Sequence, residues 1–108
     1  MSLNMKLLFD ECVPRPLRKE FIGHEVSTIE EAGYKSLKNG ALAASQEFEV
    51  LITVDKNLVY QQNPQKLSMA VLVLDVRANK LERFLPLMSK ALDALMTISP
   101  GEIVTIEV

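Results

Sequence analysis

The hydrophobic residues of the chain gather in short runs, separated by segments in which apolar positions recur at helical spacing. Five runs have the length and pattern of β-strands: 6–9, 25–29, 50–54, 70–76 and 103–106. The third run is rich in β-branched residues, and the fourth is nearly all apolar, which is typical of a central strand. We expect the last run at an edge of the sheet.

Helix signals stand between these runs. Pro14 and Pro16 indicate a helix start, Gly23 a helix end, and Asn39 is suited to cap a further helix. Helices or helical turns are expected over 16–22, 30–33, 40–48, 56–62 and 79–96. The last is amphipathic, and Pro86 within it should kink it or separate its first turn. Because strands alternate with helices, we predict a three-layer α/β domain around a mainly parallel central sheet of four to five strands.

Size and composition limit this picture further. A chain of 108 residues is expected to form one domain, here over residues 5–108, with a core that needs no disulfide. The single cysteine, Cys12, excludes an intrachain disulfide and fits a reducing cytoplasm, and no signal peptide or membrane span is visible. The formal net charge of −2 gives no global basic field, which counts against a long nucleic-acid interface but leaves a local basic patch open.

Two of the predicted strands end in carboxylates. Asp10 and Glu11 follow the first strand, and Asp55 follows the third. In open parallel sheets, ligands bind in the crevice at the carboxyl ends of the strands, where clustered carboxylates can hold a hard cation such as Mg²⁺. Such a cation suits phosphodiester chemistry, because it neutralises developing charge and positions water. Asn57 and Asp75 are nearby candidates for a further ligand.

Each of these residues also has a plain structural interpretation. Asp10 and Asp55 would serve equally well as caps of the turns or helices that follow their strands. For Asp75, a helix cap or a salt bridge is favoured over a ligand role. His24 is expected to be a turn residue and Cys12 a small packing residue, since no second histidine or cysteine completes a zinc site.

Basic residues offer candidate phosphate contacts. Arg15 and Lys56 lie nearest to the predicted acidic site, and we expect them to contact a phosphate backbone. Arg18 and Lys19 are better explained as a solvated helix face. The sequence has no glycine-rich phosphate loop, nucleophile elbow or dinucleotide fingerprint, which excludes the commonest nucleotide-binding enzymes and acyl-transfer hydrolases.

Four stretches, taken in order and spacing, resemble a known family: LFDECVP (8–14), GHEV (23–26), LKNGAL (37–42) and LITVDKNL (51–58). They are similar to the small stand-alone PIN-like proteins, a toxin-like branch of the PIN nuclease superfamily. This resemblance implies a three-layer α/β fold with acidic residues at the carboxyl edge of a parallel sheet. Active PIN-like domains are Mg²⁺- or Mn²⁺-dependent ribonucleases, and many are toxins of toxin–antitoxin pairs.

By this resemblance Asp10 and Asp55 match acids of the metal site, and Asn57 stands where related proteins often carry another Asp. Two positions depart from the family pattern. Cys12 replaces a common Asn, and Ala41 stands where related proteins usually carry an acidic residue. Alanine offers no oxygen, so this replacement should weaken the binding of a reluctantly dehydrated ion such as Mg²⁺.

Three functions remain open. The first is a cytoplasmic, PIN-like, metal-dependent ribonuclease in which Asp10 and Asp55 bind the cation. Glu11 would bind the cation or orient water, and Asn57 would position a ligand water or the substrate. RNA, a cognate antitoxin and a second copy of the chain are the expected partners, without a membrane. The second function is a PIN-like binding module that has lost catalysis, for which Ala41 is the reason. The third is a receiver-type phosphoacceptor, although the lysine that such a site has after a later strand is not evident.

Overall fold

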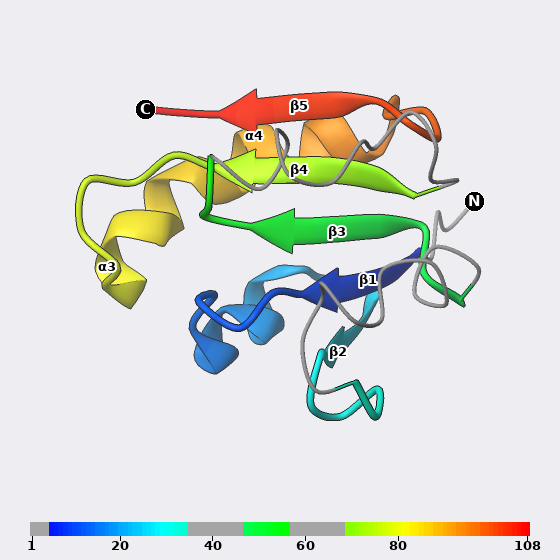
Figure 1. Ribbon diagram of the computed structural model, residues 1–108. Coiled ribbons are helices and arrows are strands. Elements are labelled where there is room, and N and C mark those ends of the chain that lie inside the picture. Colours follow the sequence, from blue (N-terminus) through cyan, green and yellow to red (C-terminus); the bar gives the residue numbers. More distant parts are fainter. Residues whose placement is uncertain (1–4, 35–46, 57–68) are drawn as a thin grey trace.

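A computed structural model describes residues 5–34, 47–56 and 69–108 of the chain. Its centre is a sheet of five strands, all parallel, in the order β2-β1-β3-β4-β5 (Figure 1). The strands are β1 (Lys6–Phe9), β2 (Glu25–Thr28), β3 (Val50–Thr53), β4 (Ala70–Leu74) and β5 (Ile103–Ile106). The predicted α/β class, parallel sheet and number of strands are therefore confirmed, and β5 lies at an edge.

The helical segments are short. A 3₁₀ helix, η1 (Arg15–Glu20), follows β1, and the chain turns at Gly23, which has a φ of 86°. The segment after β4 comprises α3 (Leu81–Phe84), the 3₁₀ turn η3 (Leu85–Leu87) and α4 (Met88–Leu95). Pro86 lies in η3 and lacks the N–H that a continuous α-helix needs, so the helix expected over 79–96 is split there. No helix of the described residues is long and apolar enough to cross a bilayer.

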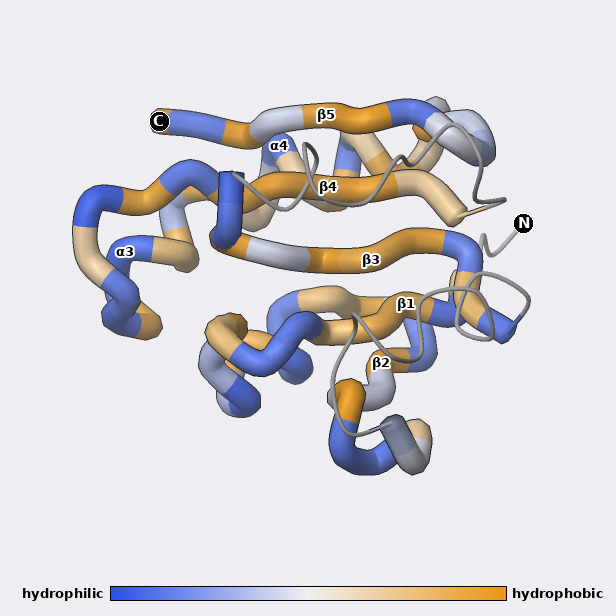
Figure 2. Tube along the Cα trace, viewed as in Figure 1, coloured by the Kyte–Doolittle hydropathy of each residue, from blue (hydrophilic) through white to orange (hydrophobic). Residues whose placement is uncertain are grey.

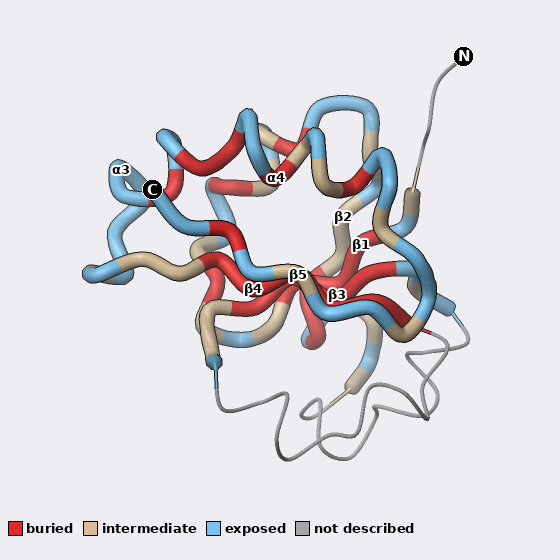
Figure 3. The backbone as a smooth tube through the Cα atoms, turned by 90° about the horizontal axis from the view of Figure 1, so that it is seen from above, coloured by how far each residue is buried: buried red, intermediate tan, exposed pale blue. Residues whose placement is uncertain are grey.

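Both faces of the sheet are buried. Leu7 and Phe9 point to the face that η1, α3 and α4 cover, and the rings of Phe9 and Phe21 meet edge to face with centroids 5.5 Å apart. Leu8 and Leu51 point to the opposite face, where they pack with Ile29 and other apolar residues. Figures 2 and 3 show the apolar, buried strands and the helices on one side of them. The third layer stays a prediction, because the helices expected over 40–48 and 56–62 lie almost wholly outside the described residues.

The two helical connections have opposite hands. β1 connects to β2 through η1, and β4 connects to β5 through α3 and α4, in opposite directions across the sheet but over the same face (Figures 1 and 3). Such connections are right-handed in almost all proteins. Strands run to the left in Figure 1 with these helices behind them, so the step from β4 up to β5 is the left-handed one. As a result, the chain after β4 returns toward β1, and α3 packs against η1.

Candidate active site

The predicted acidic residues lie where the strand order reverses. The chain places β2 on one side of β1 and β3 on the other, so the gap between the carboxyl ends of β1 and β3 is the switch point of the sheet. Asp10 follows β1 directly, and its backbone N–H donates to the carbonyl of Ile52 at 2.9 Å. Asp55 follows β3 by two residues. The sheet therefore brings both residues to one edge, as the strand endings predicted.

Thr53 joins these two residues. Its side chain is fully buried, and its hydroxyl donates to Asp10 Oδ2 at 2.8 Å. The same hydroxyl oxygen accepts the backbone N–H of Asp55 at 3.1 Å. A single inward-facing hydroxyl thus holds the Asp10 carboxylate beside the backbone of Asp55. Thr53 was not among the predicted site residues, and its only signal in the sequence was a hydroxyl residue in an otherwise apolar strand.

The carboxylate of Asp10 is fixed at both oxygens. Oδ1 accepts the backbone N–H of Glu11 at 2.8 Å, while Oδ2 accepts the Thr53 hydroxyl. A carboxylate has about four lone-pair positions, so Oδ1 keeps one that can face a cation, whereas Oδ2 is also approached by the weak thiol donor of Cys12. Asp10 is half-buried and Asp55 likewise, whereas Glu11 is exposed. The arrangement orients Asp10 without using up its capacity as a ligand.

Cys12 lies beside this carboxylate, with Sγ 3.7 Å from Asp10 Oδ2. Burial raises the pKa of the Cys12 thiol, and the negative charge of Asp10 raises it further. The thiol is therefore protonated at neutral pH and acts as a weak donor to Asp10. This agrees with a packing role for Cys12 and gives no support to a thiolate ligand.

The described residues hold no ready-made cluster of metal ligands. Among residues 5–34, 47–56 and 69–108, no three His, Cys, Asp or Glu side chains gather closely enough to hold a metal ion. Asn57, a predicted site residue, lies outside this part of the chain, as does Ala41. Asp10 and Asp55 stay the two carboxylates that are predicted to hold a cation.

Asp75 and Lys56 form an ion pair at the same edge. Asp75 follows β4, and its Oδ1 lies 2.8 Å from Lys56 Nζ. The salt-bridge interpretation of Asp75 is therefore confirmed. Lys56 remains 63% exposed in its side chain, so its ammonium group is open to a further anion from solvent. The two residues form a boundary of the site next to Asp55.

The basic residues after β1 already have anionic partners. Arg15 pairs with Glu30 and Arg18 with Glu31, each with a nitrogen–oxygen distance of 2.6 Å. The hydrogen bond from Arg18 is the main reason that the pKa of Glu31 is lowered, and the backbone N–H of Thr28 adds to the effect. Both pairs are exposed, so the Arg15 guanidinium, which the sequence assigned to phosphate, is engaged but not buried.

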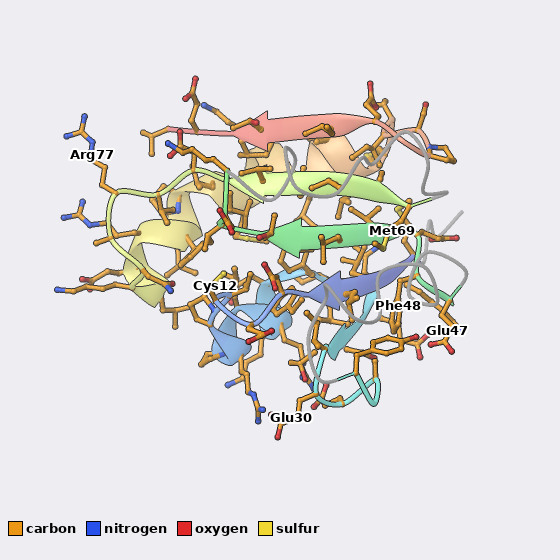
Figure 4. The ribbon with its side chains drawn as sticks, viewed as in Figure 1. Cys12, Glu30, Glu47, Phe48, Met69 and Arg77 are labelled. Carbon is orange, nitrogen blue, oxygen red and sulfur yellow. The ribbon has the colours of Figure 1, made fainter. Side chains whose placement is uncertain are left out.

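Asn79 connects the chain after β4 to the turn after β1. Its side-chain Nδ2 donates to the carbonyl oxygen of Cys12 at 2.8 Å. Asn79 was expected at the start of a helix, and this contact was not predicted, because it depends on the left-handed return of the chain. Figure 4 shows Cys12 and the loop that carries Arg77 at this edge of the sheet.

His24 lies at the other end of the sheet. Its Nδ1 accepts the backbone N–H of Met5 at 3.2 Å, so the neutral imidazole helps to position the chain at the entry to β1. Burial lowers the pKa of His24, and the charge of Glu49 opposes this only in part. The expected role as a turn residue agrees with this position, away from the acidic site.

Comparisons with known proteins identify no relative of this chain: no family model matches it, and no curated protein or solved structure is similar to it at a significant level. The class of the molecule is therefore given by its fold alone, an α/β domain with a five-stranded parallel sheet.

Proposed function

We propose that this protein is a PIN-like, metal-dependent ribonuclease whose cation is held by Asp10 and Asp55. One observation carries the proposal: the buried Thr53 hydroxyl hydrogen-bonds both residues at the switch point of a parallel sheet. Ligands of open α/β sheets bind at this position.

The residues present fit a magnesium or manganese ion. Mg²⁺ usually keeps several waters and is bound through one or two carboxylates together with substrate phosphates. Asp10 and Asp55 supply two carboxylates, so the substrate and water would complete the coordination. When bound, such a cation supplies charge neutralisation at the phosphoryl group and lowers the pKa of water.

The remaining residues have roles in binding and proton transfer. Glu11 is exposed next to Asp10, where its carboxylate can orient or deprotonate an attacking water. Lys56 follows Asp55, and its exposed ammonium group would contact a phosphate of the RNA strand. Asn57 would position a ligand water or the substrate. As a ribonuclease toxin in the cytoplasm, the protein would be controlled by a cognate antitoxin.

Cleavage of single-stranded RNA or transfer RNA in the presence of Mn²⁺ tests this proposal. The Asp10→Asn/Asp55→Asn variant should lose cleavage by a hundredfold or more, about what is lost when a single transition-state contact of an enzyme is removed. A matched control, Glu82→Gln/Asp93→Asn, removes the same charge from exposed positions on α3 and α4 and should cleave like the wild type. Equal activity of the site variant and the control would refute the assignment.

A second candidate is a binding module of the same fold without catalysis. It is favoured by the absence of a three-residue metal cluster in the described residues and by Ala41. Calorimetric titration with Mn²⁺ separates the two candidates. No heat of binding for the wild type, with binding gained in Ala41→Glu, would support the module, whereas tight binding by the unmodified chain would exclude it.

The strand order also keeps the receiver-type phosphoacceptor as a third candidate, because the order 2-1-3-4-5 is that of one common doubly wound fold. In such a site Asp55 would accept a phosphoryl group. Incubation with a small phosphodonor followed by intact-mass measurement tests this, and a protein that gains no phosphate closes the option.

A further inference from the structure

A second feature of the carboxyl edge is a cleft beyond the acidic pair, over the ends of β4 and β5. It has a volume of about 640 Å³. Its lining residues are Lys56, Asp75, Val76, Arg77, Arg83, Glu107 and Val108. Lys56 follows Asp55 in sequence, so the cleft begins where the acidic pair ends. We call it the Arg77–Arg83 cleft.

The arginines of this cleft differ from those after β1. Arg15 and Arg18 are each paired with a glutamate at 2.6 Å. In contrast, Arg77 and Arg83 form no ion pair with any residue of the described parts of the chain. Both are exposed, and Figure 4 shows Arg77 extending from the loop after β4. Their guanidinium groups are therefore available to an external anion.

The charges of the cleft favour a particular kind of anion. Three cationic side chains and two side-chain carboxylates line it. Of these, Lys56 already forms an ion pair with Asp75, with a nitrogen–oxygen distance of 2.8 Å. Because carboxylates line the cleft together with the cations, the single charge of a phosphodiester suits it better than the double charge of a terminal phosphate. Guanidinium groups bind phosphate oxygens through paired N–H donors, which a lysine cannot do.

We propose that the Arg77–Arg83 cleft binds an internal phosphodiester of the RNA strand, beside the phosphate that the acidic pair would hold. The identity of the ligand as RNA rests on the proposed ribonuclease function. The strand would run along the carboxyl edge from β1 and β3 toward β4 and β5. The basic contacts that were predicted for Arg15 would then come from Arg77 and Arg83 instead, because Arg15 is already paired with Glu30.

Binding without metal tests the cleft independently of cleavage. Fluorescence anisotropy of a labelled single-stranded oligoribonucleotide in EDTA reports binding when no cation can support catalysis. The Arg77→Gln/Arg83→Gln variant should bind about tenfold more weakly than the wild type at low salt. The slope of log K against log salt should fall by about 0.7, since the two arginines contact one phosphate and each phosphate neutralised on a single strand contributes about 0.7.

A matched control removes two paired arginines. Arg15→Gln/Arg18→Gln changes the net charge equally and should bind within about twofold of the wild type, because exposed paired charges contribute little. An equal loss in this control would show that only net charge matters and would overturn the cleft. Unchanged binding by the Arg77→Gln/Arg83→Gln variant, or no binding by the wild type, would also refute the proposed role of the cleft.

Two further measurements separate related outcomes. Oligoribonucleotides with and without a 5′-phosphate should bind equally, and clear preference for the phosphorylated one would refute the internal position. Cleavage with Mn²⁺ is measured on the same proteins. If RNA binding depends on Arg77 and Arg83 but no cleavage occurs, the proposed ribonuclease function is contradicted and the RNA-binding role of the cleft is supported. If cleavage occurs but the Arg77→Gln/Arg83→Gln variant binds RNA like the wild type, only the role of the cleft is contradicted.

Discussion

The replacement Thr53→Val is the sharpest perturbation of the acidic site that the structure offers. Valine has nearly the shape of threonine, so the variant fills the same buried space at the end of β3 while it removes the hydroxyl. The Asp10 carboxylate then loses its donor at 2.8 Å, and the backbone N–H of Asp55 loses its acceptor at 3.1 Å. The variant therefore tests one hydroxyl with two partners.

The two bonds set the expected cost. A hydrogen bond to a charged acceptor contributes about 1.5–3 kcal/mol and a neutral one about 0.5–1.5 kcal/mol. Asp10 is half-buried and keeps access to water, which favours the low end of these ranges. The methyl group that replaces the hydroxyl in valine is buried and stabilises the folded state by about 0.8 kcal/mol. We expect a net loss of about 1 kcal/mol in the free energy of unfolding. Thr53→Ser keeps the hydroxyl and should lose about 1 kcal/mol through its missing methyl group.

Urea denaturation measures these losses, and Mn²⁺ titration calorimetry measures the site. Thr53→Val should weaken Mn²⁺ binding about tenfold, since the freed carboxylate must be ordered when the cation binds, whereas Thr53→Ser should bind like the wild type. Two results would refute the reasoning. One is a Thr53→Val variant whose stability lies within about 0.5 kcal/mol of the wild type, which is the ordinary range of a surface substitution. The other is equal loss of Mn²⁺ binding in the valine and serine variants.

Three further predictions concern other parts of the fold. The lowered pKa of His24 means that the unfolded chain binds more protons than the folded one below about pH 6.5, so stability should be complete above that pH and fall as the pH drops. His24→Asn, whose side-chain oxygen can still accept the Met5 N–H, should lack this dependence, and an identical acid profile of the two proteins would refute the assignment. Gly33 has a φ of 90°, so Gly33→Ala should lower the melting temperature at a cost of about 1 kcal/mol, and an unchanged melting temperature would contradict the strained turn. Asp75→Asn breaks the ion pair with Lys56, whose side chain is exposed, so the variant should change the free energy of unfolding by less than about 1 kcal/mol. A larger loss in urea denaturation would contradict this prediction.

The sequence predicted the inner strands well, because β1, β3 and β4 are buried on both faces and read as continuous apolar runs. The edge strands β2 and β5 have exposed positions and were indicated by alternation and β-branched residues instead. The first and last runs have the observed bounds, but the run at 70–76 extends past the end of β4. Hydropathy cannot show where the hydrogen-bond ladder stops. Val76 continues the apolar pattern and packs against the core although the strand has already ended.

Asp10 and Asp55 could be predicted as neighbours because parallel topology alone brings their strand ends to one edge. The role of Thr53 could not, since threonine is common in strands and only the register shows that its hydroxyl faces Asp10. The ion pair between Arg15 and Glu30 could not be predicted from the sequence either. It depends on how η1 packs beside the turn after β2, which no local pattern encodes.

A crystal of the protein soaked in Mn²⁺ tests the central claim most directly, because the anomalous signal of manganese locates the ion without assumptions about its ligands. We predict a peak coordinated by the carboxylates of Asp10 and Asp55, with metal–oxygen distances of about 2.0–2.6 Å, in the range for hard cations. The Thr53 hydroxyl should remain bonded to Asp10 Oδ2 in that structure. A map without a peak at these two residues, or with manganese only elsewhere on the molecule, would contradict the account.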